Sequence, residues 1–114
     1  MALALGMTRY TPDATKALLA EGAVRRAEYF TRVIESLGGT VLGYYFAEGN
    51  DCDVVALVDI PDEERDIARS VAFGALNWSS GMAESMRVTW LTTPEQFDAA
   101  LEKATGIAAP GQEP

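Results

Sequence analysis

The residues with the clearest potential for chemistry are two tyrosines and one arginine in stretches predicted to be β-strands. Tyr10 and Tyr45 carry phenols, and Arg87 lies between two hydroxyl side chains. A phenol can donate or transfer a proton, and a guanidinium can hold a carboxylate or an enolate. The candidate pocket residues are therefore Thr8, Tyr10, Tyr45, Ser85, Arg87 and Thr89.

Simple structural roles compete with these chemical ones. Tyrosine is common at protein interfaces, where its hydroxyl usually finds one hydrogen bond, and we favour that role for both phenols. A buried guanidinium needs a partner, so we favour an inter-strand or inter-subunit ion pair of Arg87 with Asp53 or Asp59 over a ligand contact. Catalysis by Tyr10 together with Arg87 requires a cavity that both side chains face.

The residue types that are absent exclude several kinds of site. The chain has no histidine, which removes the usual general base near neutral pH and the common histidine-ligated metal centres. Cys52 is the single cysteine, so no intrachain disulfide can form, and no neighbouring cation activates its thiol. Asp51 and Asp53 offer too few oxygen ligands for a hard cation. The sequence therefore predicts no metal and no cofactor.

The charge balance limits the partners. The chain has a formal net charge of −8, and its nine Lys and Arg residues are scattered. We therefore expect no binding to nucleic acid or to an anionic membrane. Residues 1–6 are apolar but lack a basic leader, and no stretch is long and apolar enough to span a bilayer. A reducing, cytoplasmic location is the expectation.

Hydrophobic periodicity predicts four strands and three helices in the order βαββαβα. Residues 2–10 alternate as a half-buried strand does. Gly22 is expected to break or kink the helix that follows this strand. A loop rich in Gly, Asn and Asp predicts a hairpin between the second and third strands. The elements are strands at 2–10, 41–46, 54–60 and 82–91, and helices at 12–37, 61–77 and 94–103. Residues 1–104 form one domain, and 105–114 form a Gly/Pro-rich tail.

This order predicts an α+β, ferredoxin-like βαββαβ fold with a short C-terminal helix. Two long helices cover only one face of its antiparallel sheet. The other face is expected to be partly apolar, and a surface of that kind usually marks an interface. We therefore expect a homodimer through the open sheet face, or a higher oligomer. The residues assigned to that face are Ala4, Gly6, Thr8, Val55, Leu57, Ser85, Arg87 and Thr89.

Five short stretches, in this order and spacing, resemble a known family over residues 6–103. They are Tyr10-Thr11-Pro12, residues 35–39 (ESLGG), residues 43–46 (GYYF), residues 53–62 (DVVALVDIPD) and residues 91–96 (LTTPEQ). The chain resembles the GYD-domain family, small bacterial proteins of the dimeric α/β-barrel type. The loop at 49–53 departs from the family pattern by one extra residue, with Cys52 where relatives often carry tyrosine. The resemblance implies the fold and the dimer.

Two interpretations of function stay open. The first is a homodimeric module that binds a small, largely apolar molecule or serves as an assembly unit. The second is a cofactor-independent enzyme of the isomerase or oxygenase type, in which Tyr10 moves a proton while Arg87 steadies an enolate-like anion. The lack of any activated side chain in the sequence favours the first.

Overall fold

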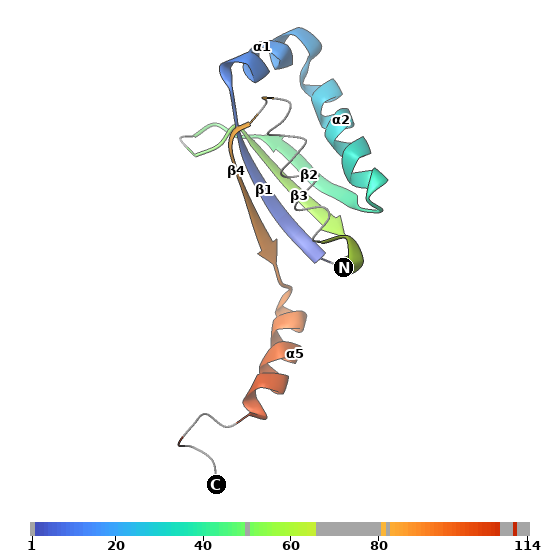
Figure 1. Cartoon of the computed structure of the whole chain (residues 1–114), viewed down its shortest axis with the longest axis vertical. Helices are drawn as coiled ribbons and strands as arrows, with labels where there is room; N and C mark the ends of the chain where they lie inside the picture. Colours follow the sequence, from blue (N-terminus) through green and yellow to red (C-terminus); the bar gives the residue numbers. More distant parts are fainter. Residues whose placement is uncertain (1, 50, 66–80, 82, 108–110, 112–114) are drawn as a thin grey trace.

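The computed structural model describes residues 2–49, 51–65, 81, 83–107 and 111. Within these residues the chain is α+β, with four strands in one antiparallel sheet and three α-helices (Figure 1). The strands are β1 (Ala2–Tyr10), β2 (Thr40–Phe46), β3 (Val54–Ile60) and β4 (Ala83–Leu91), and the helices are α1 (Pro12–Glu21), α2 (Ala23–Ser36) and α5 (Pro94–Thr105). Most of the helix predicted at 61–77 lies outside the described residues, which show a 3-10 turn at Asp62–Glu64.

The helical hairpin after β1 begins and breaks where the sequence predicts. The Thr11 hydroxyl accepts a hydrogen bond from the backbone N–H of Ala14, and Pro12 occupies the first turn of α1. Gly22 separates α1 from α2 with a φ of 93°, a backbone conformation that side chains with a Cβ rarely adopt. The break turns the chain, so that α2 runs back over the sheet.

The sheet has the order β2-β3-β1-β4, and every pairing is antiparallel. The third strand therefore lies between the first and the second, and this order is compatible with a ferredoxin-like fold. In β2 the register shifts between Val41 and Gly43, a bulge that places one extra residue on that strand.

The two faces of β1 are the reverse of the prediction. Ala4, expected on the open face, is fully buried in the core with Ile34, Val58 and Ile60. Directly paired residues of neighbouring strands share a face, and Ala4 pairs with both Val58 and Trp90. Gly6 and Thr8 follow Ala4 onto the face covered by α2. Met86, Val88 and Trp90 of β4 pack against the same cluster.

Packing beneath α2 explains the reversal. The helix directs large side chains toward the middle of the sheet, among them Phe30 and Ile34. Small residues on the central strands leave room for them, and β1 and β3 supply Ala4, Gly6 and Ala56. The choice of face thus follows the shape of the helix surface rather than the hydrophobicity of β1 alone.

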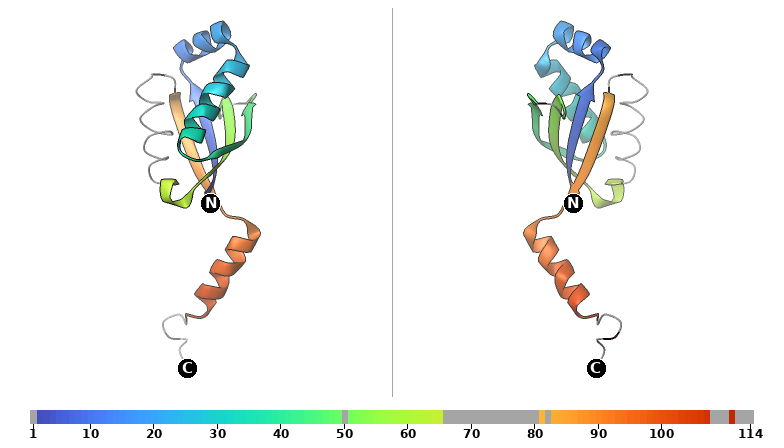
Figure 2. Two further views of the ribbon diagram at one scale, coloured as in Figure 1. Left: turned by 90° about the vertical axis from the view of Figure 1, so that its right-hand side faces the viewer. Right: turned by 90° about the vertical axis from the view of Figure 1, so that its left-hand side faces the viewer.

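The opposite face of the sheet carries the larger residues of β1. Leu3, Leu5 and Met7 lie there, half-buried, with Val55 and Leu57 of β3 beside them. Seen from that side, no described helix lies in front of the strands (Figure 2). This open face is more apolar than the sequence predicts, because leucines and a methionine replace Ala4, Gly6 and Thr8 on it.

Helix α5 extends past the end of the sheet, on the side where the N-terminus lies (Figure 1). It begins with a capping box, in which Thr93 and Gln96 each bind the other's backbone N–H. Every residue of α5 is exposed, including Phe97 and Leu101, which lie one turn apart on the same side of the helix. No helix among the described residues is long and apolar enough to cross a membrane.

Candidate functional site

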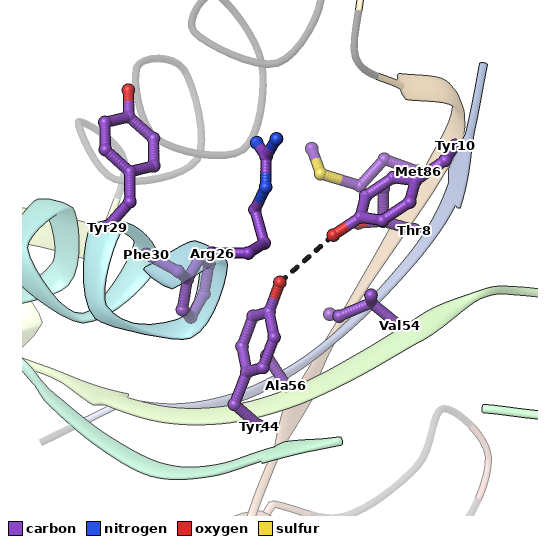
Figure 3. A pocket seen from close by; sticks show the side chains of 10 residues that line it. Thr8, Tyr10, Arg26, Tyr29, Phe30, Tyr44, Val54, Ala56 and Met86 are labelled. Carbon is purple, nitrogen blue, oxygen red and sulfur yellow. Dashed lines mark hydrogen bonds between the residues drawn. The ribbon is translucent and has the colours of Figure 1, made fainter. Parts of the chain in front are cut away.

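Two phenols meet between α2 and the sheet. The hydroxyl oxygens of Tyr10, at the end of β1, and Tyr44, in β2, lie 3.1 Å apart and share a hydrogen bond (Figure 3). Either hydroxyl can be the donor. One O–H proton is used in this bond, so the pair keeps a second O–H for another partner.

Backbone contacts hold Tyr10 in place. Its N–H donates to Oδ2 of Asp53 at 2.8 Å, and the N–H of Asp53 donates to the carbonyl of Thr8, also at 2.8 Å. The carboxylate therefore fixes the end of β1 just before β3 begins. Neither bond depends on the phenol, so the ring of Tyr10 is positioned without using its hydroxyl.

Two neighbouring aromatic rings hold Tyr44. The Phe30 ring, from α2, lies 5.2 Å from the Tyr44 ring and is tilted to it by 45°. The Phe46 ring lies 5.6 Å away in an edge-to-face arrangement. Aromatic pairs at such separations are favourable and restrict the rotation of the ring. The Tyr44 hydroxyl is thereby directed toward β1.

A buried arginine stands beside the phenols. Arg26, in the first turn of α2, is 7% exposed, and its guanidinium carbon lies 6.0 Å from the centre of the Tyr10 ring. Its Nε forms an ion pair with Oε1 of Glu21 at 2.7 Å. The pair joins the last residue of α1 to α2 across Gly22, and it supplies the carboxylate that a buried guanidinium requires.

The surroundings keep both phenols protonated. Burial raises the pKa of Tyr10, an effect that the hydrogen bond with Tyr44 and the charge of Arg26 only partly oppose. Burial also raises the pKa of Tyr44, and its hydrogen bond with Tyr10 raises that pKa further. At neutral pH these groups therefore act as hydrogen-bond donors and not as bases.

The phenols and Arg26 line a cavity of about 60 Å³. Most of its wall is apolar, and its polar groups come from Thr8, Arg26 and the tyrosines. Figure 3 shows the Tyr10 and Tyr44 hydroxyls directed toward each other at its wall. The lining residues are Gly6, Thr8, Tyr10, Arg26, Tyr29, Phe30, Tyr44, Val54, Ala56 and Met86.

The structure does not bring the six sequence-predicted pocket residues together. Thr8 and Tyr10 line the cavity. The other four are exposed, and Tyr45, Arg87 and Thr89 pair with open-face residues of β1 and β3. Tyr10 and Arg87 consequently lie on opposite faces of one sheet. A single chain cannot present both to one substrate, because the sheet separates them.

Sequence reasoning missed Tyr44 and Arg26 as site residues. The bulge before Gly43 interrupts the alternation of β2, so the sequence could not show which of Tyr44 and Tyr45 faces the helices. Arg26 had a usable signal. It lies four residues before Phe30 and eight before Ile34, on the stripe of α2 that faces the sheet.

The ion pair expected between Arg87 and an aspartate is not formed within the described part of the chain. Among the described residues Arg87 forms no ion pair within the chain, and the Asp53 carboxylate accepts the Tyr10 backbone N–H instead. Arg87 is exposed, so water satisfies the charge that a buried position would have left without a partner. Cys52 is a free, buried thiol. In the part of the chain that the structure describes, no three acidic or cysteine side chains cluster to hold a metal ion.

Comparison with protein-family models finds one match. The GYD-domain model matches residues 5–101, which include every described strand except the first three residues of β1, and both helices of the helical hairpin. No curated protein matches the chain. The match covers most of the sequence and agrees with the stretches that carried the resemblance. The chain belongs to the GYD-domain family.

Proposed function

We propose that the protein is a homodimeric module that binds a small, largely apolar molecule carrying one hydrogen-bond acceptor. The observation that supports this most directly is the phenol pair at the wall of an apolar cavity. Ligand sites typically combine apolar walls with a few well-placed polar groups. The two neutral phenols have one O–H left to donate, and a carbonyl or ether oxygen can accept that hydrogen bond.

The cavity limits the size of the enclosed group. Its volume is about 60 Å³. It is well below the ~300 Å³ at which pockets for drug-sized ligands begin. The ligand is therefore a short-chain molecule, or the short end of a longer one.

A titration followed by NMR tests the binding. Butyramide and 2-butanone each carry a carbonyl and a short apolar chain, and we expect either to shift the amide signals of Tyr10, Tyr44 and Phe30 with a Kd on the order of millimolar, since few atoms contribute to the affinity. The double variant Tyr10→Phe/Tyr44→Phe should weaken binding about fivefold because it removes both O–H donors, whereas each single variant leaves one O–H for the ligand.

Tyr45→Phe is the matched control, because it deletes the same hydroxyl from a side chain that is 66% exposed on the open face. Its binding should equal that of the unaltered chain. Saturating additions of both compounds that leave the three site signals unmoved would rule out the proposed binding.

The open face of the sheet supports the dimer. Leu3, Leu5 and Met7 of β1 lie on it beside Val55 and Leu57 of β3, and no described helix lies in front of these strands (Figure 2). A contiguous apolar face of this kind usually marks an interface between proteins. The open face, with Leu5, Met7 and Leu57 at its centre, is the proposed contact surface.

A further inference from the structure

Arg26 stands at the boundary between the enclosed cavity and the molecular surface. It lines the cavity together with Tyr10 and Tyr44, and it also lines a shallow outer groove with Arg25, Tyr29 and Arg32. A guanidinium at this boundary can reach a group inside the cavity or one that enters from the groove. Its own side chain stays buried in both cases.

The carboxylate that now pairs with Arg26 is poorly held. The Glu21 side chain is 38% exposed, so it can turn into water without opening the core. Glu21 is also the last residue of α1. The C-terminal end of a helix carries partial negative charge, so a carboxylate there is disfavoured. Gly22, which follows, has open space where a side chain would lie.

The outer groove attracts anions. Arg25, Arg26 and Arg32 line it against the single acid Glu21, although the chain as a whole carries a net charge of −8. A local cluster of cations raises the concentration of anions at its surface and steers them inward. The groove leads to Arg26, which lines both the groove and the cavity, as Tyr29 also does.

We propose that the pocket binds the carboxylate of a short organic acid at Arg26, in the position that the Glu21 carboxylate occupies in the unliganded chain. This deepens the proposed function and rests on it. The two carboxylates exchange on one guanidinium, and no covalent bond changes.

The contacts available match a carboxylate. A guanidinium binds a carboxylate through two parallel N–H···O bonds, and such charge-assisted bonds are the stronger kind. The remaining O–H of the phenol pair can donate to the same group, and the apolar chain then lies against Phe30, Val54 and Met86. One buried guanidinium balances one negative charge, which favours a carboxylate over a dianionic phosphate.

Butyrate and butyramide are the probes, because they have the same shape and differ in charge. At pH 7 and low salt we expect butyrate to bind about fivefold more tightly than butyramide. Glu21→Gln removes the competing carboxylate, so the Kd of butyrate should fall about threefold while that of butyramide stays unchanged. Glu35→Gln, an exposed acid at the other end of α2, controls for the change in net charge.

Arg26→Lys keeps the charge but loses the two-pronged contact, and we expect about fivefold weaker butyrate binding with an intact amide spectrum. If Arg26→Lys does not fold, the effect of Glu21→Gln on the Kd of butyrate still tests the proposal. If butyramide binds and butyrate binds no better, with no effect of Glu21→Gln, the carboxylate site is wrong and the proposed function stands. If neither probe binds, both are overturned.

Discussion

The phenols of Tyr10 and Tyr44 meet over β3, although their own strands are not hydrogen-bonded to each other. The residues of β3 beneath them are Val54 and Ala56, both buried and small enough to leave the hydroxyls in contact. The hydrogen bond thus joins β1 to β2 across the strand that separates them. It links parts of the chain 34 residues apart.

Loss of the hydrogen bond between Tyr10 and Tyr44 should destabilise the fold, and the effects of changing the two tyrosines should not be additive. We expect Tyr10→Phe and Tyr44→Phe each to lower the free energy of unfolding by about 1 kcal/mol, measured by urea denaturation. The double variant should lose less than the sum of the two, because each single change already breaks the same bond. Tyr45→Phe, at an exposed phenol, should change stability by less than about 0.5 kcal/mol. Strict additivity would show that the two hydroxyls do not interact.

The raised pKa values of Tyr10 and Tyr44 predict a loss of stability in alkali. Each phenol keeps its proton in the folded state above pH ~10, where the unfolded chain releases it. The stabilisation is therefore complete below pH ~10 and is lost as the pH rises through the folded-state pKa values. Urea midpoints measured from pH 8 to 11 should fall above pH ~10, more steeply for the unaltered chain than for the double phenylalanine variant. Parallel curves for the two proteins would contradict the assignment.

The break at Gly22 should tolerate no side chain. Gly22→Ala meets no neighbouring atom, yet it forces a Cβ onto a backbone with φ 93° and ψ 153°. We expect a loss of about 2 kcal/mol in the free energy of unfolding, since this region is essentially restricted to glycine. Gly49→Ala is the matched control, because its Cβ also meets no atom and its φ is not positive. Equal losses for the two variants would indicate that α1 and α2 do not need this conformation.

The proposed dimer can be tested by a charge on the open face. Leu57→Glu places a carboxylate at the centre of that face, where desolvation would be costly, so we expect a monomer in sedimentation equilibrium at micromolar concentration. Leu19→Glu makes the same change on α1, at a side chain already 81% exposed, and should leave the assembly unaltered. A monomer in the unaltered chain at that concentration would refute the proposed interface.

The order of the elements, the break at Gly22 and the position of the third strand were all predictable, because they depend on local periodicity, glycine and connection rules. The alternation of β1 was predictable as well. Its orientation was not, since Ala4 and Gly6 lie beneath α2 to make room for Phe30 and Ile34. The rule that the larger apolar residues of a strand face the core fails here, because α2 fills that space with its own large side chains.

The candidate site was predictable only in part for the same reason. Tyr10 and Thr8 were identified as pocket residues, but the pocket lies on the face opposite to the expected one. Tyr44 depends on a bulge that local sequence does not reveal, and Arg26 resembles the solvent-facing Arg25 next to it. The ion pair that buries Arg26 needs Glu21, which reaches it only because Gly22 turns the chain.

The exposure of helix α5 has a consequence for its stability. Isolated helices shorter than about 12–15 residues are marginal in water, and α5 has 12 residues, all exposed. Its capping box and the first-turn proline favour its beginning, but no described part of the same chain covers Phe97 and Leu101. The amide hydrogens of α5 should therefore exchange with solvent far sooner than those of β1 and β3, and any partner that covers its apolar side would slow that exchange. Hydrogen exchange in α5 therefore reports whether a partner covers this helix.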